Sequence, residues 1–270
     1  MKHGLRILSF LVFLIPGLAT FGGQTAFAIP QVRPAFDVAT IKPVDPNDRS
    51  GRYIVMQGGH QFIAKAYSLK RMVSAAYNLP LKAISGGPEW TDSDPYDIRA
   101  VTPGENRPPL DEQMLMLQTL LTDRFKLSFH REPKEFAVYE LTVAKSGSRL
   151  KESTAPPDQP SEIINTVFPG EKIRLPARNA TMGQFASMLQ RGVFDRPVLD
   201  KTNLAGRYDF DLEWTYDDSQ FGGILPPIKP ENANKPNLFA ALQELGLKLE
   251  PSRAAIDTIV IDSVQRPSEN

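Results

Sequence analysis

The same series of sequence patterns occurs twice along the chain, and it constrains the fold more than any other feature. Each half contains an amphipathic helix pattern, an alternating strand that opens with Tyr-Asp, a second helix pattern and two β-rich runs. A helix with one apolar face and a strand with one apolar face each need a second layer to cover them. We therefore expect an α+β fold of two similar helix-strand-helix-hairpin units, each forming a two-layer sandwich.

In the first half, Ser68 is placed to cap a helix whose apolar residues recur at the i, i+3, i+4, i+7 spacing of a single buried face. A strand is predicted at residues 96–101 and a second helix around residues 114–121. A hairpin of residues 126–130 and 138–143 closes the unit. Extra N-terminal strands are predicted before the first helix, at residues 36–41, 53–56 and 61–66.

In the second half, Thr181 is placed to cap the corresponding helix and Gly192 to end it. The elements predicted after it are a strand at residues 208–214, a helix at 238–245 between Asn237 and Gly246, and a hairpin of residues 247–250 and 256–264.

A stretch rich in Ser, Thr, Pro and acidic residues separates the two halves. Together with the N-terminal pattern described below, this stretch divides the chain into four predicted parts. They are a signal peptide at residues 1–28, a first α+β unit at 29–152, a linker at 153–170 and a second α+β unit at 171–270. The alternative is a single continuous domain at residues 29–270, whose halves look alike because such elements are common.

The N-terminus has the three parts of a cleavable secretory signal peptide. Lys2 and Arg6 supply the basic start, residues 7–19 the apolar run, and Ala26-Phe27-Ala28 the cleavage pattern, so the mature chain is expected to begin near Ile29. An uncleaved membrane anchor is the alternative, but the apolar run is shorter than the roughly 20 residues of a spanning helix. We expect an exported protein, periplasmic or extracellular.

The composition excludes several classes of partner and site. The sequence has no cysteine, so disulfides and thiolate metal sites are excluded. Removal of Lys2 and Arg6 leaves 29 basic against 31 acidic residues, a balance that gives no basis for nucleic-acid binding. No apolar run after the signal peptide is long enough to be a transmembrane segment.

Several stretches of the chain resemble a family of exported soil-bacterial proteins that is expanded in Acidobacteria and has a conserved domain of unknown function. The resemblance rests on residues 180–182, 195–200, 206–210 and 238–249, together with residues 36–43. In relatives, similar domains follow a membrane metallopeptidase sensor of β-lactamase expression, which implies an extracytoplasmic sensing or binding role. The helix-strand-helix-hairpin unit is also distantly similar to the short N-terminal domain of secretins and TonB-dependent receptors. The resemblance supplies no catalytic residues.

Candidate chemical groups are few. The mature chain has two histidines, His60 and His130, both in strand-like runs and without metal-ligand spacing, so structural or surface roles are favoured. Three acids, Asp209, Asp211 and Glu213, alternate with apolar residues and would share one strand face. That face is either a calcium site or, as we favour, simply solvated.

Other patterns also have a simple structural interpretation. The S-x-x-K sequence of residues 148–151 lies at a strand end, where a penicillin-binding serine is not expected. Four aromatic residues in strand-like segments suit a hydrophobic core better than a ligand groove. They are Trp90, Tyr96, Tyr208 and Trp214.

We predict a non-catalytic binding or protein-interaction module whose partner is an envelope protein or a small envelope ligand. No catalytic, cofactor-binding or metal residue is assigned, and no cofactor is expected. The alternative is an envelope hydrolase whose acids, such as Asp97, Asp209 or Glu89, converge only in the fold. A deep pocket that gathers two of these acids or a histidine would favour the hydrolase.

Overall fold

A computed structural model describes residues 33–45, 47–48, 51–156 and 159–267, and the predicted signal peptide, residues 1–28, lies outside them. From Arg33 onward the chain forms one compact unit. It combines helices with three sheets, so the expected α+β class is confirmed. No helix in the described stretches is long and apolar enough to cross a membrane.

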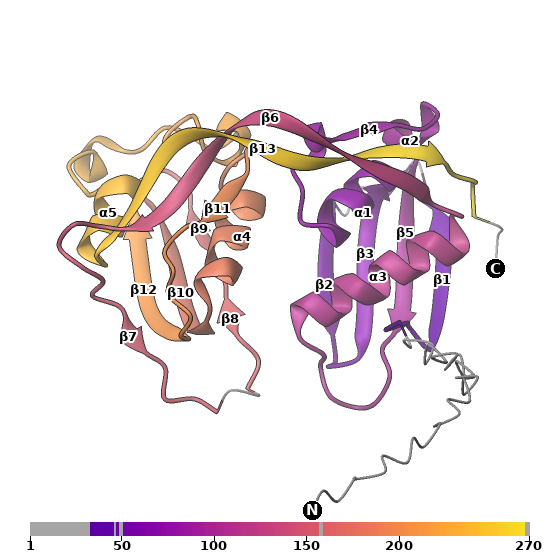
Figure 1. Ribbon diagram of the computed structural model, residues 1–270, viewed down its shortest axis with the longest axis horizontal. Helices are drawn as coiled ribbons and strands as arrows, with labels where there is room; N and C mark the ends of the chain where they lie inside the picture. The colour runs from indigo at the N-terminus through magenta and orange to yellow at the C-terminus, as the bar shows by residue number, and fades with distance from the viewer. Residues whose placement is uncertain (1–32, 46, 49–50, 157–158, 268–270) are drawn as a thin grey trace, which may run out of the picture. The chain divides into compact units, whose positions relative to one another are not determined.

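The first sheet has the strand order β1-β5-β3-β2 and is antiparallel throughout. Helices α1 and α3 lie against one of its faces (Figure 1) and bury a core that includes Phe62, Ile98 and Leu117. The elements are β1 (Val38–Pro43), β2 (Tyr53–Gln57), β3 (Gln61–Ser68), α1 (Leu69–Ala76), α2 (Trp90–Ser93), β5 (Pro95–Val101) and α3 (Leu110–Arg124).

The second sheet has the order β7-β12-β10-β8, with β9 also paired to β10. Its core includes Phe185, Leu212 and Leu242. Residues 153–170, interpreted as a linker, contribute two short strands to this sheet. The elements are β7 (Lys151–Glu152), β8 (Glu162–Ile163), β9 (Thr166–Phe168), β10 (Lys172–Ala180), α4 (Met182–Gly192), β12 (Tyr208–Trp214) and α5 (Leu238–Glu244).

The helix starts that the sequence predicts are confirmed. Ser68 occupies the N-cap position of α1 but its side chain makes no capping hydrogen bond, and the buried residues of α1 are the four at the predicted spacing. Thr181 begins α4 with a capping box: its Oγ1 accepts the N–H of Gln184 at 3.2 Å, and the Gln184 side chain accepts the N–H of Thr181 at 3.0 Å. This exchange satisfies two backbone donors that the helix itself cannot.

The two predicted hairpins are wrong. Each is one long strand, β6 (Ser128–Val143) and β13 (Leu247–Ser263), and these two strands pair with each other, antiparallel, over most of their length (Figure 1). Two short strands complete this third sheet in the order β11-β6-β13-β4, where β4 is Ile84–Gly86 and β11 is Val198–Asp200. The ladder contributes to both cores, because Leu141 and Leu249 lie in one and Ile259 and Ile261 in the other.

A matching irregularity precedes the first helix of each half. The register between β3 and β5 shifts between Ala64 and Tyr67, and that between β10 and β12 shifts between Ala177 and Ala180. Within these bulges Ala66 and Asn179 adopt positive φ angles of 54° and 49°. Such a conformation is unfavourable for Ala and better tolerated by Asn, so local contacts must stabilise each bulge.

Candidate functional site

The two Tyr-Asp pairs supply the contacts that hold these bulges. Asp97 accepts the backbone N–H of Ala66 at 2.9 Å and pairs with Lys65 Nζ at 2.5 Å. Asp209 accepts the backbone N–H of Asn179 at 2.8 Å. That bond is the main reason why the pKa of Asp209 is lowered, with Ser153 and nearby cations adding to it against the effect of burial.

The acids named for a hydrolase therefore do not converge. Asp97 lies on β5 and Asp209 on β12, in different sheets, and each serves its own bulge. Glu89 is exposed just before α2. The two histidines are also apart: His60 lies in the turn between β2 and β3, where a strand was expected, and His130 is exposed on β6.

The predicted alternation on β12 is confirmed. Its apolar side chains are buried, whereas Asp211 and Glu213 are exposed. Nη2 of Arg178 donates to both carboxylate oxygens of Asp211 at 3.0 Å, and Nζ of Lys172 donates to Glu213 Oε2 at 2.7 Å. Cations of the chain thus pair with two of the three acids considered for calcium, and the third, Asp209, holds its bulge. No cluster of three or more ligating side chains occurs in the described part of the chain.

The predicted core role of the aromatic residues is also confirmed for three of the four. Tyr96, Tyr208 and Trp214 are at most 6% exposed and belong to the two cores. Trp90 packs edge-on against Tyr96 at the margin of the first core, with the Arg266 guanidinium 4.9 Å from its ring. These rings provide packing rather than a ligand groove.

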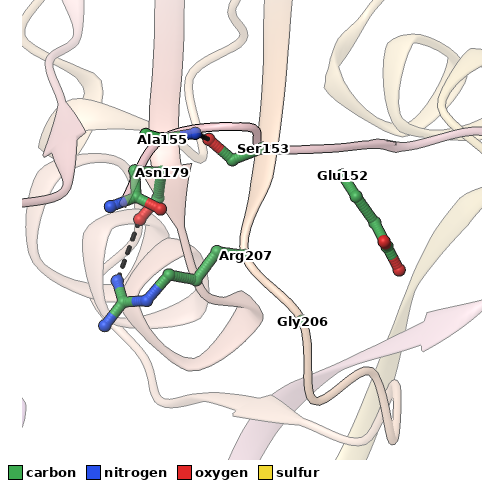
Figure 2. A pocket seen from close by; sticks show the side chains of 6 residues that line it. All are labelled: Glu152, Ser153, Ala155, Asn179, Gly206 and Arg207. Atoms are coloured by element: carbon green, nitrogen blue, oxygen red, sulfur yellow. Dashed lines mark hydrogen bonds between the residues drawn. The ribbon is translucent and has the colours of Figure 1, made fainter. Parts of the chain in front are cut away.

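A hollow of about 250 Å³ lies beside the second bulge. We call it the Asn179 hollow. Figure 2 shows Arg207 turned toward Asn179, while the Glu152 side chain points away from both. The residues that line the hollow are Glu152, Ser153, Ala155, Asn179, Gly206 and Arg207.

Asn179 has an unused hydrogen-bond acceptor. Its side-chain nitrogen donates to the carbonyl oxygens of Gln159 at 2.6 Å and Pro156 at 3.3 Å, which fixes the orientation of the amide. The residue is 1% exposed, yet its Oδ1 has no partner among the described residues. A buried acceptor without a partner costs about 1–3 kcal/mol, so a ligand that donates to it would recover that free energy.

The other polar groups of the hollow are already engaged in part. Arg207 donates through Nη1 to the carbonyl oxygen of Asn179 at 3.0 Å, which leaves further N–H groups of its guanidinium for a second acceptor. The Ser153 hydroxyl accepts the N–H of Ala155 at 3.3 Å. The hollow therefore offers one acceptor and one cationic donor, which suits recognition of a polar group.

Sequence reasoning missed the hollow because its residues come from three separate segments. The detectable signal was Asn179 itself, which lies two residues before the helix cap Thr181. Asn is enriched in left-handed conformations, so a bulge there was a reasonable inference. No pattern in the sequence indicates the partners of its side chain.

A family described as "Protein of unknown function (DUF3738)" matches residues 70–264. The chain belongs to the DUF3738 family. The expectation of an uncharacterised family is thereby confirmed, and the match includes both bulge-holding aspartates of this DUF3738 chain. No curated protein and no solved structure matched it.

Proposed function

We propose that this protein is an exported, non-catalytic binding module of the cell envelope that contacts an envelope protein or a small envelope ligand. The observation that carries the proposal is the Asn179 hollow, where a fixed, buried amide has an unused acceptor beside a partly free guanidinium. A recess with a few well-oriented polar groups is typical of a recognition site. Export rests on the signal peptide that the sequence predicts at residues 1–28.

The hydrolase alternative needs a pocket that gathers two carboxylates, or a carboxylate and a histidine. His130 does lie 2.6 Å from Asp262, but both side chains are exposed on β6 and β13. Asp97 and Asp209 instead stabilise separate bulges. The resemblance to secretin and TonB-receptor modules, and to domains behind a β-lactam sensor, agrees with a contact function and belongs to the same proposal.

Affinity capture from crosslinked envelope fractions tests the proposal. The chain is expressed with its own leader and a C-terminal tag, and compared with Ala155→Leu, which places a larger side chain in the hollow. The control is Ala255→Leu on the exposed part of β13. We expect a partner that wild type and the control retain and that Ala155→Leu depletes. No partner from any sample, under conditions that preserve known envelope complexes, would overturn the proposal.

A further inference from the structure

Three arginines lie within electrostatic reach of Tyr67, away from the Asn179 hollow. Arg52 precedes β2, Arg71 lies on α1 and Arg191 on α4. The guanidinium carbon of Arg52 is 5.8 Å from the centre of the Tyr67 ring. All three cations act electrostatically on the Tyr67 phenol, and each lowers its pKa against the larger, opposite effect of burial. We call this set the arginine cluster.

Hydrogen bonds from the neighbouring turns of α4 keep Arg191 near the first sheet. Gln190, next to Arg191, donates to the carbonyl oxygen of Asn78 at 2.7 Å, and Asn78 donates to Ser187 Oγ at 2.8 Å. Gln190 is buried, and its side-chain oxygen accepts the N–H of Val198 at 3.2 Å. Arg191 is therefore fixed in place by its helix rather than by a contact of its own charge.

None of the three arginines forms an ion pair with an acid among the residues that the structure describes. Ion pairs within 4 Å join many cations of the described chain to carboxylates, but none of them includes Arg52, Arg71 or Arg191. Asp92 acts on Arg71 from a distance but is bound to Lys70 at 2.6 Å. Partial desolvation lowers the pKa of both Arg71 and Arg191, and Arg52 lowers that of Arg71 further.

Arg52 and Arg71 are like charges that act on each other without an ion-pair partner, which raises the free energy of the folded state, and an anion between them relieves it. By surface area Arg52 and Arg191 are exposed and Arg71 is half-buried, so an incoming group has access to the cluster, although neighbouring atoms partly desolvate the Arg191 guanidinium. The guanidinium fork matches the paired oxygens of phosphates and carboxylates. The Tyr67 hydroxyl adds a neutral donor.

We propose that Arg52, Arg71 and Arg191, together with the Tyr67 hydroxyl, bind a multivalent oxyanion, a phosphate or carboxylate group of a larger ligand. This site is separate from the Asn179 hollow and does not depend on it. Because the cations come from both halves of the chain, an anion bound here also bridges α1 and α4.

Isothermal titration calorimetry of the full chain with inorganic pyrophosphate, and separately with citrate, tests the site. Either anion should bind saturably, and Arg71→Gln or Arg191→Gln should weaken binding about tenfold. The anion that binds more tightly identifies the source as phosphate or carboxylate. The matched control is Arg149→Gln, which removes the same charge from an exposed arginine outside the cluster. Absence of binding by both anions, or equal weakening by the control, overturns the proposal.

A second readout separates anion binding from a structural effect of the substitutions. The arginines lower the pKa of Tyr67, so an anion that neutralises them should raise that pKa further. The measurement is the phenolate absorbance of wild type minus that of Tyr67→Phe across a pH titration, with and without pyrophosphate. Arg191→Lys keeps the charge and should retain part of the shift. A Tyr67 pKa that saturating pyrophosphate leaves unchanged contradicts the site.

Discussion

His130 lies between two carboxylates on the exposed surface of the β6–β13 ladder. Its Nδ1 is 2.6 Å from Asp262 Oδ1 on the neighbouring strand, and its Nε2 is 3.3 Å from Glu132 Oε1 on its own strand. The bond to Asp262 is the main reason that the pKa of His130 is raised above its usual 6.5, and the bond to Glu132 adds to it. Lys134, 3.1 Å from Glu132, lowers the pKa of that carboxyl.

This geometry predicts a pH-dependent contribution to stability. Because folding raises the pKa of His130, the contribution is fully present below about pH 6.5, the pKa of the unfolded chain, and disappears as the pH rises through the folded value. The difference in urea midpoint between wild type and His130→Gln should therefore shrink as the pH rises from 5 to 9. Asp262→Asn should behave like His130→Gln. A difference that is constant over this range contradicts the assignment.

At the level of single residues, the sequence indicates types of side chain better than their partners. The Tyr-Asp pairs are evident as a repeat, but Asp97 bonds to the backbone of Ala66, a residue whose identity does not suggest a left-handed conformation. The arginine cluster was not predicted because Arg52, Arg71 and Arg191 are far apart in the sequence. The hydrogen bond from α4 to Asn78 brings Arg191 to the first half, where Arg52 and Arg71 lie.

At the level of elements, helices were predicted well and the two longest strands were not. A helix is specified by local signals, such as the Thr181 cap, which the structure confirms. The interruptions predicted around Pro133 and Pro251 are absent because a proline is tolerated where a strand has a free edge. One edge of β6 pairs with β13, and its other edge pairs with β11 only at Tyr139–Leu141. Likewise, the second edge of β13 pairs with β4 only at Ile259–Ile261.

The junction between α5 and β13 allows a sharp prediction about backbone conformation. Gly246 has a φ of 72°, and a Cβ there would lie 2.1 Å from the carbonyl oxygen of Gly147. Gly246→Ala should therefore lower the free energy of unfolding by roughly 2–3 kcal/mol. Gly183→Ala is the matched control, since nothing lies closer than 4.0 Å to its Cβ position in α4. Urea denaturation should show Gly183→Ala unchanged or more stable by up to about 1 kcal/mol. Equal destabilisation of the two variants contradicts the prediction.

At the level of the whole molecule, each half adds a short strand to the long strand of the other, within one shared sheet. The short strand after the first helix of the first half, β4, pairs with β13 from the second half. Its counterpart in the second half, β11, pairs with β6 from the first. The order of elements was visible in the sequence, but this exchange was not, because strand pairing between distant segments leaves no local pattern. The division into units at residues 29–152 and 171–270 stays a prediction.

Because β6 and β13 contribute to both cores, we expect the two cores to unfold together. Leu117 is fully buried in the first core, and Leu117→Ala should cost about 2–5 kcal/mol. Trp214 is buried in the second core, and in a Trp90→Phe background it is the sole tryptophan and reports on that core alone. In this background Leu117→Ala should move the Trp214 fluorescence transition to lower urea concentration. Leu242→Ala is the positive control, because Leu242 lies in the same core as Trp214.

The two outcomes of that experiment separate the two interpretations of the sequence. A lower urea midpoint for Trp214 after Leu117→Ala means that loss of packing in the first core is transmitted through the shared ladder, as in one cooperative domain. A Trp214 transition that only Leu242→Ala moves means that the halves unfold independently. The ladder would then be a connection between two domains, and the arginine cluster, whose residues come from both halves, would depend on their docking.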